Sequence, residues 1–577
     1  MSDARIGRAT PVANYQSRRC NRLALDSQPR VGSTDSLHIK RRQWGVEGSR
    51  DFGACILAGA SAYRPAREVK PRLERGLVLK HSLPRPVLRD TMPAMLRTFY
   101  IHTLGCRVNH YESEQFATAL RAKGLTEASK PSDADLRIVH TCSVTHEAAV
   151  KSGQVSRRMT RLPVLLPAVC ASSDEASVPN ARARVIVTGC WATSDKTTAQ
   201  ALEGVDAVIG HHDDVAGELG RLLDQWQGGT PVSPDARPIS DTLATVGTSR
   251  LPILGEKQTG HQRAFLKIQD GCDAHCTYCI IPSLRPTLWS KPVDDAVREA
   301  RQLVASGHVE LVLTGIFVGA YGQATALRRR QDTGPTTPLA RLVETLCLDV
   351  PGLRRLRLSS LEPGDLTPEL LRVLRSHGQV VPHFHLPLQS GSDAMLRKMN
   401  RQYTRDDFLD MIDRVQHAFD RPALTTDIIV GFPGETEEDF DRTLEVVDRA
   451  KFLHIHAFPY SSRPGTAAAR WTDAFVPKAA SGRRLHILEA HSATHSTSFR
   501  ESFMGETVDV LVEHSSHSAD RLIAGDGSTE GLRHGRCERY FDVHFEAPPL
   551  AAGTLVRVRV DRVSAGHTHG RLVEVLT

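Results

Sequence analysis

The stretch FLKIQDGCDAHCTYCIIPS, residues 265–283, places three cysteines at the end of an apolar, strand-like segment. Cys272, Cys276 and Cys279 follow a C-x3-C-x2-C spacing and run into an Ile-Ile-Pro stretch. Thiolates are soft ligands that suit zinc ions or iron–sulfur clusters. We therefore interpret this loop as a metal site that directly follows a strand.

The number of ligands distinguishes two kinds of metal site. Structural zinc is normally held by four protein ligands, and His275, inside the loop, is poorly spaced to close a tetrahedron. A zinc site would therefore need a distant histidine. A four-iron cluster held by three cysteines leaves one iron open for a substrate or cofactor. The spacing favours the open cluster, and a zinc-containing RNA-binding protein is the non-enzymatic alternative.

Strands alternate with helices from the cysteine loop onward. Six βα units predict an α/β core, an incomplete TIM-type barrel of (β/α)6 form, whose chemistry lies at the carboxyl ends of its strands. The expected strands are residues 264–269, 309–315, 353–361, 383–389, 424–432 and 453–460.

A second alternation precedes the loop and predicts a small open α/β domain with a parallel sheet. Its expected strands are residues 97–105, 134–142, 184–190 and 205–210, and its expected helices are residues 111–124 and 144–162.

Three of these strands end in a cysteine, namely Cys106, Cys142 and Cys190. Consecutive parallel strands end at the same edge of a sheet, where ligands bind. We therefore expect the three thiols to converge as a second ligand set. Cys170 lies in a Pro/Ser/Ala-rich insertion and is not expected to join them.

Composition divides the chain further. Residues 1–95 hold 18 basic and 8 acidic residues, so the excess positive charge of the chain lies there. The expected domains are residues 1–94 as a basic, disordered extension, 95–225 as the first α/β domain, 226–258 as a Gly/Pro/Ser-rich linker, 259–498 as the barrel, and 499–577 as a small β-barrel of about five strands, like an oligonucleotide-binding fold.

Two classes of protein are excluded by simple counts. No apolar run approaches the roughly 20 residues that span a bilayer, so no membrane partner is expected. The eleven cysteines are odd in number and no secretory signal precedes them, so a disulfide framework is not expected and the cytoplasm is the predicted location.

The motifs as a group resemble a known family. The cysteine loop, with Tyr278 just before its last cysteine, resembles the radical S-adenosylmethionine enzymes. With GCRVNHYESE (105–114), TCSVTHEA (141–148), VTGC (187–190) and the C-terminal β-barrel, the chain is similar to the methylthiotransferases over about residues 96–577. The resemblance implies S-adenosyl-L-methionine, an RNA-binding TRAM domain, and two [4Fe-4S] clusters, one on Cys106, Cys142 and Cys190 and one on Cys272, Cys276 and Cys279.

Within that family, GCRVNHYESE is most similar to the branch acting on N6-threonylcarbamoyladenosine in tRNA. The resemblance implies an enzyme that methylthiolates C2 of this adenosine, next to the anticodon at position 37, by radical chemistry. Methylthiolation of isopentenyladenosine in tRNA, or of an aspartate in a ribosomal protein, is the alternative. The expected partners are the tRNA anticodon loop and an electron donor such as flavodoxin or ferredoxin, but not DNA.

Other segments match the family core at the expected strand ends. Their candidate cofactor contacts are Tyr278, Thr314, Gly315, Ser360, Glu362, Gln389 and Asp427. Candidate phosphate contacts in the C-terminal barrel are Arg533, Arg536, Arg539, Arg557, Arg559 and Arg562. The chain departs from the family over residues 284–291, where Arg285 matches but Pro286 replaces a glycine and Trp289 is unexpected. The sequence leaves open whether substrate contacts are altered there.

Overall fold

The computed structural model describes residues 89–90, 96–164, 180–227, 251–255, 262–328, 337–513 and 531–577. These residues belong to one compact unit, Ser82–Thr577. The predicted extension 1–94, most of the insertion around Cys170 and most of the linker lie outside the described residues. No helix in the described ranges is long and apolar enough to cross a membrane.

The first domain is built on a five-stranded parallel sheet of order β3-β2-β4-β6-β7. Every residue of β4 is buried, because this central strand is covered on both faces. The strands are β2 (Thr98–Thr103), β3 (Thr126–Glu127), β4 (Leu136–Thr141), β6 (Arg184–Gly189) and β7 (Ala207–Ile209). A separate pair joins β1 (Arg89–Asp90) to β5 (Asn180–Ala181).

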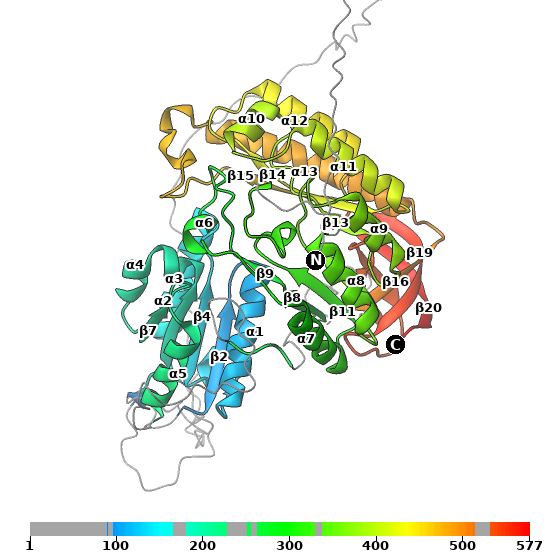
Figure 1. Cartoon of the computed structure of the whole chain (residues 1–577). Helices are drawn as coiled ribbons and strands as arrows, with labels where there is room; N and C mark the ends of the chain where they lie inside the picture. The colour runs from blue at the N-terminus through cyan, green and yellow to red at the C-terminus, as the bar shows by residue number, and fades with distance from the viewer. Residues whose placement is uncertain are drawn as a thin grey trace, which may run out of the picture. The chain divides into compact units, whose positions relative to one another are not determined.

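Helices α1 to α5 connect and cover this sheet (Figure 1). Threonine and aspartate caps start two of them, since Thr145 accepts from the Ala148 amide and Asp214 from the Gly217 amide. The helices are α1 (Arg107–Ala122), α2 (His146–Arg161), α3 (Cys190–Ser194), α4 (Lys196–Gln200) and α5 (Val215–Trp226), with a 3-10 turn at Pro131–Asp133.

The core holds six parallel strands in two three-stranded sheets, of order β12-β11-β8 and β13-β14-β15. A parallel bridge from Leu356 to Val380 joins the two sheets at β12. The strands are β8 (Arg263–Lys267), β11 (Glu310–Thr314), β12 (Arg355–Leu358), β13 (His383–His385), β14 (Ala423–Val430) and β15 (His454–Pro459), with the short antiparallel pair β9 (Gln269–Asp270) and β10 (Trp289–Ser290).

Helices follow these strands and pack outside them (Figure 1). They are α7 (Val293–Ala305), α8 (Pro338–Asp349), α9 (Pro368–Ser376), α10 (Asp393–Lys398), α11 (Arg405–Ala418), α12 (Glu437–Ala450) and α13 (Lys478–Glu501). The short helix α6 (Ile281–Leu284) instead follows the cysteine loop and contacts α3 of the first domain. Short 3-10 turns lie at Val318–Ala320, Ala468–Arg470 and Thr472–Ala474. A single apolar core runs from the strands to these helices, as the parallel α/β prediction requires.

The C-terminal region is a closed five-stranded barrel of order β16-β17-β18-β20-β19. Its strands are β16 (Thr507–Val512), β17 (Leu532–Cys537), β18 (Asp542–Glu546), β19 (Leu555–Ser564) and β20 (His567–Val575). Closure pairs every edge strand and so removes exposed edges. The fold class predicted from the sequence, an α/β protein with a parallel-stranded core and a small β-barrel, is confirmed.

Three local expectations differ from the structure. The first helix begins at Arg107, directly after Cys106, and not at Tyr111. Residues 251–255 of the predicted linker are packed, because Leu251 and Leu254 are buried. In the barrel, β17 at Leu532–Cys537 forms from a segment with no clear alternation, while the strand expected at residues 520–525 lies outside the described residues.

Candidate active site

The first cysteine set lies at the carboxyl edge of the N-terminal sheet. Cys106 caps α1 just after β2, Cys142 directly follows β4, and Cys190 opens α3 after β6. A Cβ added at Gly105 would stand 3.0 Å from the Cys142 Sγ atom, so the Cys106 turn lies against Cys142. Cys106 is exposed while Cys142 and Cys190 are buried. The set therefore has one thiol open to solvent.

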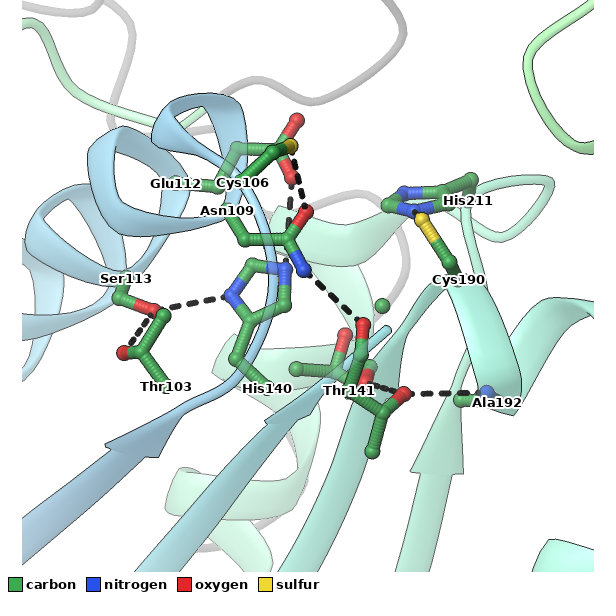
Figure 2. Close-up of polar contacts among 12 residues, drawn as sticks. Thr103, Cys106, Asn109, Glu112, Ser113, His140, Thr141, Cys190, Ala192 and His211 are labelled. Atoms are coloured by element: carbon green, nitrogen blue, oxygen red, sulfur yellow. Dashed lines mark hydrogen bonds and ion pairs between the residues drawn. The ribbon is translucent and has the colours of Figure 1, made fainter. Parts of the chain in front are cut away.

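Two residues fix the loops that carry these thiols, and Figure 2 shows the first of them, Asn109. The Asn109 side-chain amide donates to the carbonyls of Leu104, at 2.8 Å, and Thr141, at 3.0 Å, and thus joins the first two loops. Gly189 has φ of 93°, and a Cβ there would meet the Thr141 carbonyl at 2.5 Å. Only glycine fits this position, which turns the chain from β6 into Cys190.

Burial holds Cys142 and Cys190 in their neutral form when no metal is bound. Burial raises the pKa of Cys190 to about 12, and Cys106 and Cys142 add to the effect. Burial likewise raises the pKa of Cys142, with Cys106 contributing. Thiols that oppose one another's ionisation become ligands only for a cationic centre, and they release protons when it binds.

The second cysteine set lies on the loop after β8 and β9. The Asn400 side chain donates to the carbonyls of Ala274, at 3.2 Å, and His275, at 3.0 Å, which secures the loop where His275 has φ of 51°. Burial raises the pKa of Cys272 to about 11 and that of Cys279 to about 12. The His275 side chain is exposed.

The sulfur atoms of the two sets are not drawn together as tightly as ligands on one ion. Two thiolates on one zinc, each about 2.3 Å from it, can be at most about 4.6 Å apart. Groups of metal-binding atoms within 4.8 Å of one another occur twice among the described residues, and neither contains a cysteine. A four-iron cluster is a larger centre than a single zinc ion, and cysteine thiolates are its usual ligands.

Arg401 contacts the second set and was not found from the sequence. Its guanidinium donates to the Cys276 Sγ atom at 3.2 Å and to the Tyr278 hydroxyl at 3.4 Å. The same side chain is paired with Glu362. Arg401 therefore links the cysteine loop to Glu362. Arg401 lies in the segment MNRQY (399–403), which has no motif that would mark it as functional in a single sequence.

The other predicted cofactor contacts lie at strand ends, in different settings. Thr314 is buried and its hydroxyl donates to the Val312 carbonyl in its own strand. A Cβ at Gly315 would be 3.0 Å from the Gln269 side chain, so the chain packs closely there. Ser360 is half-buried just after β12.

The two remaining candidates lie on β14 or beside it. Gln389 has φ of 63°, and its backbone pairs with Asp427 at 2.8 Å and Ile429 at 3.0 Å. The Asp427 carboxylate lies 3.2 Å from the His385 Nε2 atom. His456 joins these two side chains, and the ligand atoms of the three are within 4.8 Å of one another.

A buried ionic cluster lies between the two cysteine sets. Arg285 makes two hydrogen bonds of 2.7 Å to the Glu112 carboxylate and bonds of 2.8 and 2.9 Å to Asp270. Lys267 donates to both carboxylates, at 2.7 and 2.6 Å. Burial alone would raise the pKa of Glu112, but Arg285 and Lys267 outweigh it and hold the pKa well below its usual range. The two cations neutralise the two carboxylates.

Arg285 also reaches both cysteine sets. Its carbonyl accepts from the Cys272 amide at 3.1 Å, and its guanidinium donates to the His211 Nε2 atom at 3.1 Å. The same Nε2 atom lies 3.6 Å from the Cys190 Sγ atom. Burial, together with Arg285, lowers the pKa of His211 to about 3. His211 is therefore neutral, with its proton on Nδ1 because arginine can only donate.

The segment that departs from the family pattern adjoins this cluster. Trp289 pairs with Asp270 through the β9–β10 ladder, and Leu284 packs against Cys190. Pro286 lines a cavity of about 230 Å³ together with Glu112 and His211. The changed residues thus lie beside the buried ionic cluster.

Two sequence families match the chain. The Radical SAM superfamily matches residues 266–447, and the Uncharacterized protein family UPF0004 matches residues 98–210. The first match contains the cysteine loop at 272–279 and the second contains Cys106, Cys142 and Cys190.

Named relatives extend over most of the chain. The threonylcarbamoyladenosine tRNA methylthiotransferase of Bacillus subtilis (strain 168) is 32% identical and covers 83% of this chain and 97% of its own. The tRNA-2-methylthio-N(6)-dimethylallyladenosine synthase of Acidothermus cellulolyticus is 34% identical, over 82% of this chain and 87% of its own. Among solved structures, the radical S-adenosylmethionine methyltransferase TsrM from Kitasatospora setae has a TM-score of 0.44 and 13% identity, covering 65% and 75% of the two chains.

Proposed function

Because this chain belongs to the radical S-adenosylmethionine methylthiotransferases, enzymes that transfer sulfur-containing groups, we propose that it methylthiolates N6-threonylcarbamoyladenosine in tRNA. The modified atom is C2 of the adenosine at position 37, next to the anticodon. The relative from Bacillus subtilis, nearly all of which aligns with this chain, supports this substrate. The relative from Acidothermus cellulolyticus supports a dimethylallyl-bearing adenosine as the second candidate.

The observation that carries this proposal is the pair of three-thiol sets in one compact unit. The family's cofactors are [4Fe-4S] clusters and S-adenosyl-L-methionine. Cys106, Cys142 and Cys190 would hold one cluster, and Cys272, Cys276 and Cys279 the other. When bound, these groups supply an organic radical and a source of sulfur, which an unactivated aromatic C–H bond requires because it is neither acidic nor electrophilic. Three thiols per cluster leave one iron open at each.

The protein's own side chains would orient and stabilise these groups. Arg401 contacts Cys276, Tyr278 and Glu362 and would hold Glu362 and Tyr278 beside the cluster that this loop carries. Arg285 fixes the two cysteine sets relative to each other through the buried ionic cluster. The exposed Cys106 turn leaves the first set accessible to a large substrate.

The C-terminal barrel would bind the tRNA through individual arginines that contact phosphates. Four of the six arginines predicted for phosphate contact already have carboxylate partners: Arg536 with Asp542, Arg539 with Glu538, Arg557 with Asp509 and Glu574, and Arg559 with Asp561. Among the described residues, Arg533 and Arg562 have none. These two are the stronger candidates for phosphate contact. A flavodoxin or ferredoxin would supply the electron.

The substrate is tested with the anaerobically reconstituted protein, S-adenosyl-L-methionine, a chemical reductant and tRNA from a strain that lacks this gene. Mass spectrometry of the digested nucleosides should show 2-methylthio-N6-threonylcarbamoyladenosine. The Cys276→Ala variant should give none. Appearance of only 2-methylthio-N6-dimethylallyladenosine would assign the second candidate. In a parallel reaction with ribosomal protein in place of tRNA, a methylthiolated aspartate together with unmodified tRNA would remove tRNA as the substrate.

Iron and sulfide content tests the cluster assignment directly. We expect about eight irons per chain, falling to about four in the Cys106/Cys142/Cys190→Ala variant, as two four-iron clusters require. Cys347→Ala is the matched control, since Cys347 is buried in α8 and belongs to neither set. Zinc without iron in the wild-type protein would contradict the assignment and leave the zinc-containing RNA-binding protein.

A further inference from the structure

Arg107 directly follows Cys106, one of the three thiols of the first set, and is the first residue of α1. Its side chain is half-buried and extends away from the N-terminal sheet into the core. The guanidinium donates to the Ser359 hydroxyl at 3.2 Å and to the Tyr540 hydroxyl at 3.4 Å. These partners come from the end of β12 and from the turn between β17 and β18. Arg107 therefore lies where the three parts of the chain meet.

Neither partner of Arg107 supplies a full negative charge. Serine is neutral, and the Tyr540 phenol has a pKa near 8, because Arg263, Arg107 and Arg536 outweigh the opposing effect of burial. Among the described residues, no carboxylate lies within ion-pair distance of Arg107. Arg285, by contrast, is matched by two carboxylates. A half-buried guanidinium with only neutral partners retains unused capacity for an anion.

Arg107 differs from the other arginines around Tyr540. Three further guanidinium groups lie over the Tyr540 ring, at 4.8 Å for Arg357, 4.6 Å for Arg536 and 5.3 Å for Arg263. Each of these three already has a carboxylate partner: Glu310 at 2.9 Å for Arg357, Asp542 at 2.9 Å for Arg536, and Glu513 at 3.2 Å for Arg263. Among the described residues, Arg107 is thus the arginine of this group that has no carboxylate partner and can accept an anion of the substrate.

Three histidines and one carboxylic acid lie on the β13–β15 side of Tyr540. His383 stacks on Tyr540 at 4.4 Å between ring centroids, and His385 and His456 lie beyond it on β13 and β15. Asp427 is the acid on this side, and it contacts His385 at 3.2 Å instead of Arg107. The histidines can donate to further oxygen atoms of a bound ligand.

We propose that Arg107 binds the carboxylate of the threonylcarbamoyl group and so selects this nucleoside over adenosines with an apolar N6 substituent. This inference rests on the proposed function. A planar guanidinium accommodates a carboxylate with two parallel hydrogen bonds. Its neighbour Cys106 belongs to the set that would hold the sulfur-donating cluster, so the bound carboxylate would place the adenine beside that cluster. A dimethylallyl group has no charge and would leave Arg107 without a counter-ion.

The test compares two anticodon stem-loop RNAs with the fully reconstituted full-length enzyme. One carries N6-threonylcarbamoyladenosine and the other carries its methyl ester, which lacks the charge and is larger by one methyl group. We expect kcat/KM of the wild-type enzyme to be about 10- to 100-fold higher for the free acid, as expected for a hydrogen bond to a charged group. In Arg107→Gln this ratio should fall to near one, mainly because KM for the acid rises.

The controls separate binding from folding. Arg121→Gln alters an arginine at the other end of α1, paired with Glu127, and should keep the wild-type ratio. Iron content and the circular dichroism spectrum show whether Arg107→Gln is folded. If that variant does not hold its clusters, Arg107→Lys carries the test, because lysine keeps the charge but loses the two-pronged geometry. We then expect the acid-to-ester ratio to fall at least threefold.

Two outcomes would overturn the inference. If Arg107→Gln lowers kcat/KM equally for both RNAs, Arg107 has a structural role or binds an RNA phosphate. The same holds if Arg107→Lys, used as the fallback, leaves the ratio unchanged. Failure of the proposed function looks different, since the wild-type enzyme would then modify neither RNA.

Discussion

Individual side chains decide how the two halves of the site are joined. Arg285, Lys267, Glu112 and Asp270 form a closed set of opposite charges with the first three nearly excluded from solvent. Buried ion pairs add little net stability when intact, but removal of one partner leaves an uncompensated charge. The cluster therefore specifies one arrangement of the two cysteine sets.

Replacement of Arg285 should be strongly destabilising. In Arg285→Ala, two buried carboxylates would share Lys267 alone, and we expect a loss of about 3–5 kcal/mol in the free energy of unfolding. Urea unfolding of the reconstituted protein at pH 7 measures this loss. Arg121→Ala removes a partly exposed pair with Glu127 and should cost less than about 1 kcal/mol. Equal losses in the two variants would contradict a special role for the buried cluster.

The ionisation of Tyr540 is a second prediction at this scale. Its pKa is about 8 although burial opposes ionisation, because Arg263, Arg107 and Arg536 favour the phenolate. Absorbance at alkaline pH should show one phenol titrating near pH 8, well before the ordinary tyrosines near pH 10. Tyr540→Phe should abolish this early step, and Arg107→Gln should move it to higher pH.

The sign of the stability effect follows from the lowered pKa. A phenol that ionises more readily when folded stabilises the protein increasingly as pH rises from about 8 to about 10. Wild type should therefore gain stability relative to Tyr540→Phe over this interval, by up to about 2–3 kcal/mol. Denaturant midpoints of the two proteins at pH 7.5 and 9.5 provide the measurement. A constant difference would show that Tyr540 keeps an ordinary pKa.

At the scale of elements, the turns after β2, β4 and β6 bring distant cysteines together. Adjacent parallel strands end at the same edge of the sheet, so the turns that follow them lie close together. Gly189 makes the closest approach, against the carbonyl of Thr141. Cys106 and Cys190 lie at the N-terminal ends of the helices that follow these turns, along the same edge of the sheet (Figure 2).

A methyl group at Gly189 should disrupt the first cluster without unfolding the chain. The added Cβ would meet Thr141 at 2.5 Å and would also require a left-handed backbone, so Cys190 would be displaced. We expect Gly189→Ala to hold about four irons in place of about eight.

Gly220→Ala is the matched control for this prediction. Gly220 lies inside α5 with nothing within 4 Å of an added Cβ. Alanine should stabilise the helix there by about 0.5–1 kcal/mol and leave the iron content unchanged. Full iron in Gly189→Ala would show that the turn tolerates the displacement.

At the scale of the whole molecule, the C-terminal barrel is joined to the core by both apolar and polar contacts. Its apolar cluster includes Ala423 and Leu453 from the core. Arg357, buried beside Glu310, also donates to the Glu538 carbonyl at 3.3 Å. Tyr540 reaches Arg107 next to the first cysteine set. The barrel is thus part of the same folded unit as the candidate active site.

Truncation after Ser502 should therefore impair more than RNA binding. Loss of the barrel would expose Ala423 and Leu453 and leave Arg355 and Arg357 short of hydrogen-bond acceptors. We expect the melting temperature to fall by about 10 °C, at roughly 2–4 °C per kcal/mol, together with reduced iron content. An unchanged melting temperature and eight irons would show that the barrel is a separable RNA-binding domain.

Much of this protein can be predicted from its sequence, because local patterns carry the information. The C-x3-C-x2-C loop and the three strand-terminal cysteines needed only spacing and the alternation of strands and helices. The six core strands were found from short segments in which apolar residues run together or alternate, most of them followed by a helical pattern. Segments without such a pattern were missed, including β17, with its Arg, His and Gly, and the packed residues 251–255.

The sequence by itself determined the ligand types, the α/β class and the position of each cysteine at a strand end, because these depend on neighbours along the chain. Only the tertiary structure decided which charges meet. Arg285 pairs with Glu112 across 173 positions, and Arg107 reaches Tyr540 across 433. No local pattern records such contacts. They arise when packed domains bury ionisable side chains and each charge must find a partner or remain available for a ligand.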